Sequence, residues 1–166
     1  MPLFRHKQTR LLTKEEIKTH AFNFLDEQHT AVIATAPKNG KPQAATVYYK
    51  IDADFTFHFV TSKNSHKHLN LKENPWAGIV VGFGPATVTI EGAGPAEIQE
   101  DDIPGDVLGE ILNRINFNSP NDWPITKIAK EGFVYIRVKP EWLSMLNLDK
   151  EGWPATYSED FHTIIP

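Results

Sequence analysis

Hydroxyl and basic side chains gather in one short stretch, residues 61–67, which reads Thr-Ser-Lys-Asn-Ser-His-Lys. A strand-like run ends at Thr61, and the helical pattern that follows opens with Ser65, His66 and Lys67. The first turn of a helix offers unpaired N–H groups and the positive end of the helix dipole, which bind anions. Hydroxyls and an ammonium complete the shell around a phosphate of about two negative charges. The segment therefore predicts a site for a phosphorylated ligand.

The same residues also have an ordinary explanation, which the pattern alone leaves open. Serine and threonine before a helix are common caps, and Lys63, Lys67 and Lys72 equally suit a solvated surface.

The sequence gives less support to cysteine chemistry or metal binding. The chain has no cysteine, which excludes thiolate nucleophiles and cysteine-ligated metals. His66 and His68 are two residues apart on a helix, so they point apart and do not chelate a metal.

Composition and length narrow the class of protein. The formal net charge is −4 and the basic residues are scattered, so a nucleic acid is not an expected partner. The first residues lack the apolar core of a signal peptide, and no stretch approaches the roughly 20 apolar residues of a spanning helix. We expect a soluble, cytoplasmic protein without a membrane segment, and 166 residues suit a single domain.

Apolar periodicity predicts the elements that must position the 61–67 segment. Thr13 and Glu16 have capping-box spacing, and apolar residues then recur at helical intervals up to Gln28. Alternating and β-branched runs predict three strands, and the Asn-Gly pair at 39–40 predicts a hairpin turn between the first two. The predicted strands cover residues 30–36, 43–51 and 55–61, and a short helix covers residues 65–74.

The second half of the chain contains more strands and one further helix. Asp101 and Asp102 mark the start of that helix, whose predicted buried stripe is Val107, Leu108, Ile111, Leu112 and Ile115. Strands are predicted at residues 76–83, 86–94 and 133–138, with a last strand at 161–165 in an otherwise irregular C-terminal part. The first six of these strands, which are short and mainly antiparallel, favour a small barrel with flanking helices. The predicted fold class is α+β, mainly β, in one domain over residues 1–166.

Single side chains carry further expectations. His58 stands between two inward-facing phenylalanines of its strand, so we expect it on the opposite, exposed face without a functional role. In the short helix, Ser62 or Asn64 is expected as the cap and Leu69 as the inward-facing residue. Gly92 inside a strand predicts a bulge or the close approach of another backbone.

The motifs from residue 24 to residue 97, taken together, resemble the flavin-binding half of the pyridoxamine 5'-phosphate oxidase-like family. In that family a hairpin and a strand lead to Thr-x-x-x-Ser-[Arg/His]-Lys, a helix ending at Asn-Pro, and a hairpin whose second strand ends in Gly. The landmarks in this chain are Thr35, Gly40-Lys41-Pro42, Tyr48-Tyr49-Lys50, Thr61, Ser65-His66-Lys67, Asn74-Pro75 and Thr89-Ile90-Glu91-Gly92. They occur in the family's order and nearly at its spacing.

The resemblance implies a small antiparallel split β-barrel that binds flavin mononucleotide (FMN). One strand would run along the isoalloxazine ring and ribityl chain, the 61–67 segment would hold the phosphate, and one residue would reach the flavin from a facing strand. The implied FMN-binding residues are Ala45, Thr46, Val47, Tyr48 and Lys50 on the first strand, Val60, Thr61, Ser62, Ser65, His66 and Lys67 around the phosphate end, and Thr87 on the facing strand.

The resemblance also implies a homodimer with two flavins in clefts at the interface.

The sequence departs from the biosynthetic oxidase of that family at two places. Ala45 stands where the biosynthetic oxidase has an arginine. Residues 146–153 contain no arginine, although the oxidase grips the phosphate of its pyridoxal substrate there with an Arg-x-His-Asp-Arg cluster. A doubly charged substrate would therefore be buried without its cationic partners. We expect a related flavoprotein with a different substrate.

Two functions fit this interpretation. The first is an oxidoreductase in which FMN accepts hydride from a nicotinamide donor or another small molecule. The second is a non-catalytic protein of the same fold that holds flavin, a deazaflavin or haem. No residue of the sequence is identified as a catalytic acid or base facing the ring, which keeps the second function open. The physiological substrate is not predicted.

Overall fold

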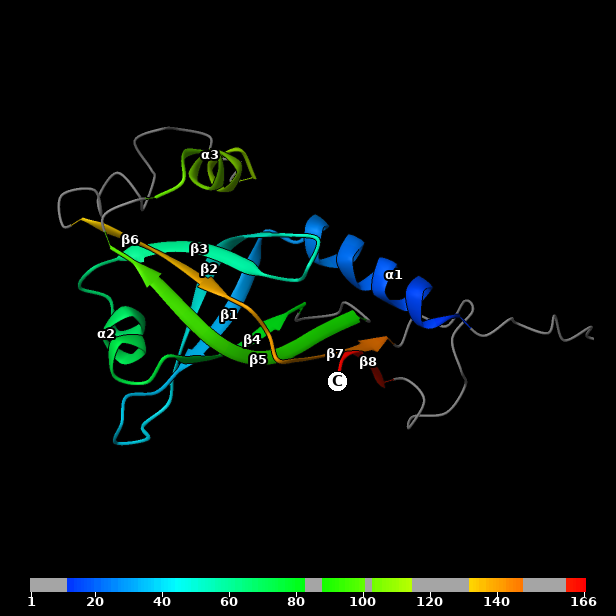
Figure 1. Cartoon of the computed structure of the whole chain (residues 1–166), viewed down its shortest axis with the longest axis horizontal. Coiled ribbons are helices and arrows are strands. Elements are labelled where there is room, and N and C mark those ends of the chain that lie inside the picture. Colours follow the sequence, from blue (N-terminus) through cyan, green and yellow to red (C-terminus); the bar gives the residue numbers. More distant parts are fainter. Residues whose placement is uncertain (1–11, 83–87, 101–102, 115–131, 148–160) are drawn as a thin grey trace, which may run out of the picture.

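The computed structural model describes residues 12–82, 88–100, 103–114, 132–147 and 161–166, which form three helices and eight strands (Figure 1). In chain order the elements are α1 (Lys14–Glu27), β1 (Thr30–Thr35), β2 (Gln43–Ile51), β3 (Phe57–Ser62), α2 (His66–Glu73), β4 (Trp76–Val81), β5 (Val88–Gln99), α3 (Gly105–Arg114), β6 (Phe133–Val138), β7 (Trp142–Asn147) and β8 (Phe161–Ile165).

Six of these strands close into an antiparallel barrel. Their order is β4-β1-β2-β3-β6-β5, and the pairing of β4 with β5 completes the ring. The strands β7 and β8 extend the sheet outward from β5. The predicted small antiparallel split barrel with flanking helices is thus confirmed. The expectation that the C-terminal part is irregular is wrong for residues 142–147, which form β7. Every second residue of β7 is buried, and the residues between them are exposed or half-buried.

The strand β5 belongs to both halves of the barrel. Residues 88–93 of it pair with β7, residues 90–95 pair with β4, and residues 96–99 pair with β6. The close backbone approach predicted at Gly92 is confirmed, because a Cβ there would lie 2.6 Å from the carbonyl oxygen of Trp142. Only glycine lets β7 pack this tightly against β5.

The helices α1 and α2 lie at opposite ends of the barrel (Figure 1). Thr13 caps α1 in the predicted capping box with Glu16. The buried hydroxyl of Tyr49 donates to the carbonyl oxygen of Leu25 at 2.6 Å, which fastens the last turn of α1 to β2. At the other end, α2 packs against β1, β2 and β5, while α3 packs on the outside of β2 and β3. None of the helices in the described residues is long and apolar enough to span a membrane.

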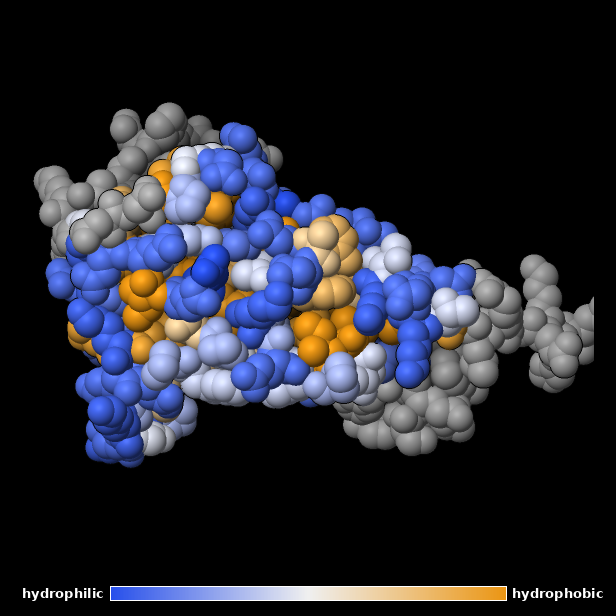
Figure 2. Space-filling model, in the orientation of Figure 1, coloured by the Kyte–Doolittle hydropathy of each residue, from blue (hydrophilic) through white to orange (hydrophobic). Residues whose placement is uncertain are grey.

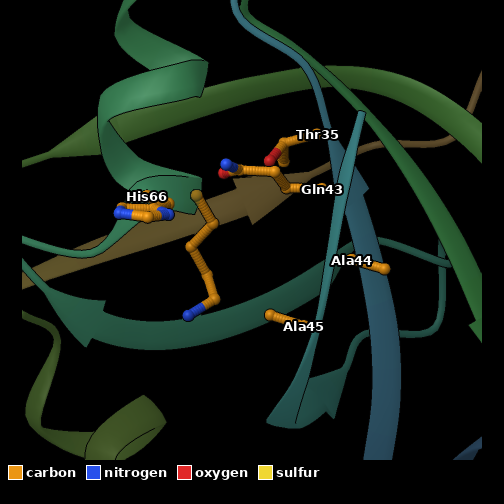
Figure 3. Close-up of a pocket in the computed structure, with 6 residues that line it drawn as sticks. Thr35, Gln43, Ala44, Ala45 and His66 are labelled. Carbon is orange, nitrogen blue, oxygen red and sulfur yellow. The ribbon is translucent and has the colours of Figure 1, made fainter. Parts of the chain in front are cut away.

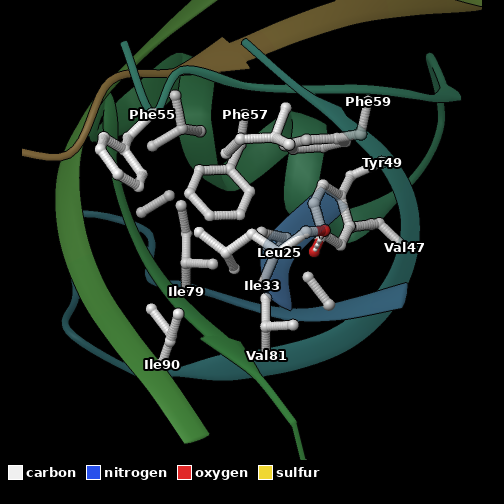
Figure 4. Packing of buried hydrophobic residues seen from close by; sticks show 14 of the residues in the cluster. Leu25, Ile33, Val47, Tyr49, Phe55, Phe57, Phe59, Ile79, Val81 and Ile90 are labelled. Atoms are coloured by element: carbon white, nitrogen blue, oxygen red, sulfur yellow. Dashed lines mark hydrogen bonds between the residues drawn. The ribbon is translucent and has the colours of Figure 1, made fainter. Parts of the chain in front are cut away.

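Aromatic and branched side chains fill the barrel (Figure 4). The two phenylalanines on either side of His58, Phe57 and Phe59, are buried as predicted. Phe55 is buried as well, and it enters the core from the turn before β3 with a left-handed φ of 64°. Hydrophilic residues cover most of the described surface on the face shown in Figure 2. The largest fully buried side chains are Tyr49, Phe57, Phe59, Leu25, Ile33, Leu71, Ile79, Ile90, Ile136, Leu143, Met145 and Val81.

Two expectations for α2 are wrong. Its cap is Ser65, whose hydroxyl accepts from the backbone N–H of His68, and not Ser62 or Asn64. Leu69 is exposed, and Leu71 is buried in its place. These two leucines lie about 200° apart around a helix, so the sequence pattern could not decide which of them faces inward without the position of the barrel. In α3, Val107 and Ile111 are buried as predicted. The predicted start of this helix at Asp101 and Asp102 is wrong, because residues 103 and 104 are not helical and α3 begins at Gly105. Asp101, Asp102 and Ile115 themselves lie outside the described residues.

The expectation that His58 is exposed is also wrong. His58 does lie on the outer side of β3, but only 6% of it is exposed because the ring of Tyr135 stacks on it at 5.9 Å. Its Nε2 donates to Asp52 at 2.9 Å, so its Nδ1 accepts from the hydroxyl of Tyr135 at 2.5 Å. The alternation of β3 correctly predicted which side of the strand His58 takes. That side is buried because Tyr135 of β6 covers it. Burial lowers the pKa of His58 below 6.5, against the pull of the Asp52 carboxylate.

This lowered pKa makes stability depend on pH. In the unfolded chain His58 takes up its proton near pH 6.5, and in the folded protein only at lower pH, so acid favours unfolding. We expect the free energy of unfolding to fall between pH 7 and pH 5, and to fall less in His58→Gln. Denaturant titrations at several pH values measure this, with the same change at exposed His29 as control. Equal pH slopes in wild type and His58→Gln would show that other groups cause the acid sensitivity.

Candidate functional site

The end of β3 and the first turn of α2 bring three polar side chains of the 61–67 segment together. The hydroxyl of Thr61 donates to the hydroxyl of Ser65 at 3.1 Å. The ammonium of Lys67 donates to the hydroxyl oxygen of Thr61 at 3.2 Å. Ser65 holds this position because it is also the cap of α2. The residues predicted to bind a phosphate therefore form one connected cluster at a helix N-terminus.

The electrostatics of this cluster depend on Lys67. Its side chain is half-buried, and burial is the cause that lowers the pKa of Lys67; no acidic side chain in the described part of the chain offsets this effect. A cation removed from water without a counter-ion is costly. An anionic ligand beside Lys67 would remove that cost.

A cavity of about 350 Å³ opens beside Lys67, between the β1–β2 hairpin and the start of α2 (Figure 3). In this view His66 on α2 lies across the cavity from Ala44 and Ala45 on β2, with Thr35 and Gln43 nearby. The side chains that line it are Thr35, Gln43, Ala44, Ala45, His66 and Lys67. Of the residues predicted from the sequence, Ala45, His66 and Lys67 line this cavity, and Thr61 and Ser65 reach it through Lys67.

The predicted residues farther along β2 divide between the two sides of the strand. Thr46 and Tyr48 are exposed on the outside of the barrel. Val47 is buried in the core, which leaves only its backbone for a ligand on the outer surface. Lys50 lies five residues beyond Ala45, or about 16 Å along an extended strand.

Lys50 differs from Lys67 because carboxylates surround it. Its Nζ lies 3.4 Å from Asp52, 3.5 Å from Glu110 and 3.9 Å from Asp106. Burial opposes the charged form, but Asp52 and Glu110 outweigh it and raise the pKa of Lys50. The two carboxylates on α3 hold this lysine at the far end of β2.

The remaining predicted residues are less central to the cavity. Val60 packs against the small apolar cluster beneath α3. The hydroxyl of Ser62 accepts from the backbone N–H of Asn64 at 3.1 Å, inside the loop. Thr87 lies outside the described residues.

Sequence reasoning assigned no binding role to three lining residues, Thr35, Gln43 and Ala44. Thr35 and Gln43 form the last residue pair of the β1–β2 hairpin, next to its turn. The predicted hairpin could therefore have indicated that these two residues lie opposite each other. The buried amide of Asn70 was also missed, although it bridges both of them. A polar residue three positions after Lys67 on the same helix is the sign that would have pointed to it.

The chain is similar to proteins of one known family. The model of the pyridoxamine 5'-phosphate oxidase family matches residues 17–147. A pyridoxine/pyridoxamine 5'-phosphate oxidase from Salinibacter ruber is 39% identical over 70 residues, which are 41% of this chain and 33% of that protein. The matched part is thus about a third of the length of that relative.

Solved structures share the fold at low identity. A pyridoxamine 5'-phosphate oxidase-related, FMN binding protein from Nostoc punctiforme has a TM-score of 0.57 and 15% identity, over 89% of this chain and 95% of that one. The haem storage protein HutZ from Vibrio cholerae has a TM-score of 0.59 and 18% identity, over 75% of this chain and 91% of that one. With the barrel and the family model in agreement, the chain belongs to the pyridoxamine 5'-phosphate oxidase-like family.

Proposed function

We propose that this protein binds FMN, with the phosphate in the cavity beside Lys67, and that it is an oxidoreductase acting on a small molecule or a nicotinamide donor. One observation carries the proposal: a half-buried ammonium without an acidic partner in the described residues, next to the hydroxyls of Thr61 and Ser65 at a helix N-terminus. Such a donor set suits a phosphate group. The FMN binding protein from Nostoc punctiforme, which shares the fold, is consistent with it.

The outer side of β2 suits the rest of the cofactor. From Ala45 the strand leads past exposed Thr46 and Tyr48 to Lys50, so one end of the ligand would lie at the cavity and the other near Lys50. When bound, FMN supplies the hydride chemistry. The chain's own residues would bind its phosphate, orient the ring along β2 and hold an ammonium beside it. Asp52 and Glu110 would keep that ammonium charged.

The Lys67 assignment is tested by comparing two ligands that differ only in the phosphate. Lys67→Ala should weaken FMN binding about ten- to a hundredfold, because a charged hydrogen bond of about 1.5 to 3 kcal/mol is lost, and should leave riboflavin binding nearly unchanged. Fluorescence titration measures both affinities. Lys14→Ala, at an exposed position of α1, is the control. Wild-type protein that binds riboflavin as tightly as FMN would contradict the phosphate site.

In the part of the chain that the structure describes, the site lacks the cations that the phosphate of pyridoxamine 5'-phosphate would need. Ala45 supplies no cation to the cavity, and the two arginines in the described residues near these strands are already paired. Arg114 binds Asp26, and Arg137 binds Glu97. A second phosphate on the substrate would therefore find no free guanidinium among the described residues, which argues against pyridoxamine 5'-phosphate.

The alternative function is a non-catalytic carrier. It is supported by the fold that this chain shares with a haem storage protein. The carboxylates near the far end of β2 are engaged with Lys50, so none of them is an evident proton donor or acceptor.

If the protein is an oxidoreductase, NADH or NADPH should bleach the visible absorbance of bound FMN without oxygen at a catalytic rate. Pyridoxamine 5'-phosphate should not be turned over. Haem or deazaflavin bound in preference to FMN would favour the carrier.

We also propose a homodimer in which a second copy of this chain covers the outer side of β1 and β4. Val32 pairs with Val80 and Ala34 with Gly78, so these four small residues share one side of the sheet. They lie outside the hydrophobic core. Trp76 on the same side is 42% exposed. An apolar sheet face bordered by an exposed tryptophan suits a two-fold interface.

The dimer is tested by placing a charge on this face. Wild-type protein should sediment as a dimer, and Val32→Asp should shift it to monomer because the interface would have to bury the carboxylate. FMN affinity should fall with dissociation, since each cleft is proposed to need both chains. Thr19→Asp, on exposed α1, is the control. A wild-type monomer that retains FMN would refute the arrangement.

A further inference from the structure

Asn70 on α2 is a buried amide, 7% exposed, that binds two residues of the cavity wall at once. Its Nδ2 donates to the hydroxyl oxygen of Thr35 at 3.1 Å and to Oε1 of Gln43 at 3.0 Å. The two hydrogens of its amide group are therefore both used, one on each strand of the hairpin. Asn70 itself does not line the cavity, so any effect it has on a ligand passes through these two partners.

The direction of these hydrogen bonds sets the polarity of the cavity. Gln43 uses its carbonyl oxygen to accept from Asn70, which leaves its NH₂ group as the end available to a ligand. Thr35 uses a lone pair of its hydroxyl oxygen, which leaves the O–H hydrogen to donate. Within the described residues these two groups have no other hydrogen-bond partner. Both partners of Asn70 therefore present donors to the cavity.

This polarity matters because Lys67 is the one lysine among the described residues that line the cavity. A phosphate monoester carries about −1.5 to −2 charges near neutral pH, and the ammonium of Lys67 balances only one. Neutral donors lower the cost of the remaining charge without adding a cation. The side chains at 44 and 45 are alanines and contribute no donor.

We propose that Asn70 is a positioning residue: by donating from its side-chain amide to both Thr35 and Gln43, it orients their donors toward the phosphate group of the bound ligand. The inference rests on the proposed function for the identity of that ligand. It adds Gln43 and Thr35 to the groups that recognise the phosphate, and it assigns phosphate selectivity to a residue that does not touch the ligand.

The first test replaces the proposed donor of Gln43 with an acceptor. Gln43→Glu keeps an oxygen for Asn70 and puts a carboxylate oxygen where the NH₂ group was, at an exposed position where folding is not at risk. The ratio of riboflavin to FMN dissociation constants should fall about ten- to a hundredfold. Asn39→Asp is the matched control, because it adds the same charge to the same hairpin and keeps its acceptor for the N–H of Lys41.

The second test reverses the network at its centre. Asn70→Asp offers only acceptors, so Thr35 and Gln43 must turn their donors inward. The same ratio should therefore fall, although the substituted residue does not itself line the cavity. A purely structural role of Asn70 would weaken FMN and riboflavin binding equally and leave the ratio unchanged. Binding of inorganic phosphate to the cofactor-free protein, followed by NMR, should weaken in both variants and not in Asn39→Asp.

The outcomes separate the two proposals. If wild-type protein prefers FMN to riboflavin but Gln43→Glu and Asn70→Asp keep that preference as Asn39→Asp does, the role of Asn70 is overturned and the FMN site stands. If wild-type protein neither prefers FMN nor binds inorganic phosphate, the proposed function fails and this inference fails with it. Should Asn70→Asp not fold, Asn70→Ser, which is shorter and uncharged, takes its place, and an unchanged ratio in that variant overturns the role of Asn70.

Discussion

The closure of the barrel through β5 is the constraint on which the rest of the structure depends. This single strand pairs with β4, β6 and β7, so it joins both halves of the sheet. Because the ring is closed, its six strands leave no unpaired edge between them. The approach of β7 to β5 at Gly92 leaves no space for a side chain. Without that closure the core would be open to water, and β2 and β3 would not be held next to each other.

The candidate site forms at one end of this ring, where several elements finish together. The hairpin of β1 and β2 places Thr35 opposite Gln43. The strand β3 ends at the loop that leads into α2, and the cap Ser65 starts the helix at that point. Asn70 then ties the helix back to the hairpin. These hydrogen bonds join the two walls of the cavity, the hairpin and α2, to each other within the fold itself.

Two lysines of the predicted FMN site have opposite surroundings, and this contrast gives the site a direction. Lys67 is half-buried without an acidic partner in the described residues. Lys50 lies among Asp52, Asp106 and Glu110. A strong anion is therefore favoured at the Lys67 end and disfavoured at the Lys50 end, where negative charge is already in excess. A ligand with a phosphate at one end and a neutral ring at the other matches this gradient.

The sequence by itself determined what depends on neighbouring residues. The capping box at Thr13, the bounds of β2 and β6, the burial of Phe57 and Phe59, and the 61–67 segment all follow from local periodicity or short motifs. The family resemblance rested on the same short motifs, and the family model agrees with it.

The tertiary structure decided what depends on contacts distant in the chain. Tyr135 covers His58 from 77 residues away, and Asn70 reaches Thr35 across 35 residues. The carboxylates around Lys50 come partly from α3, which no local pattern places beside β2. Periodicity states which side of an element a residue takes, and only the packing of other elements determines whether that side is buried, paired or left open to a ligand.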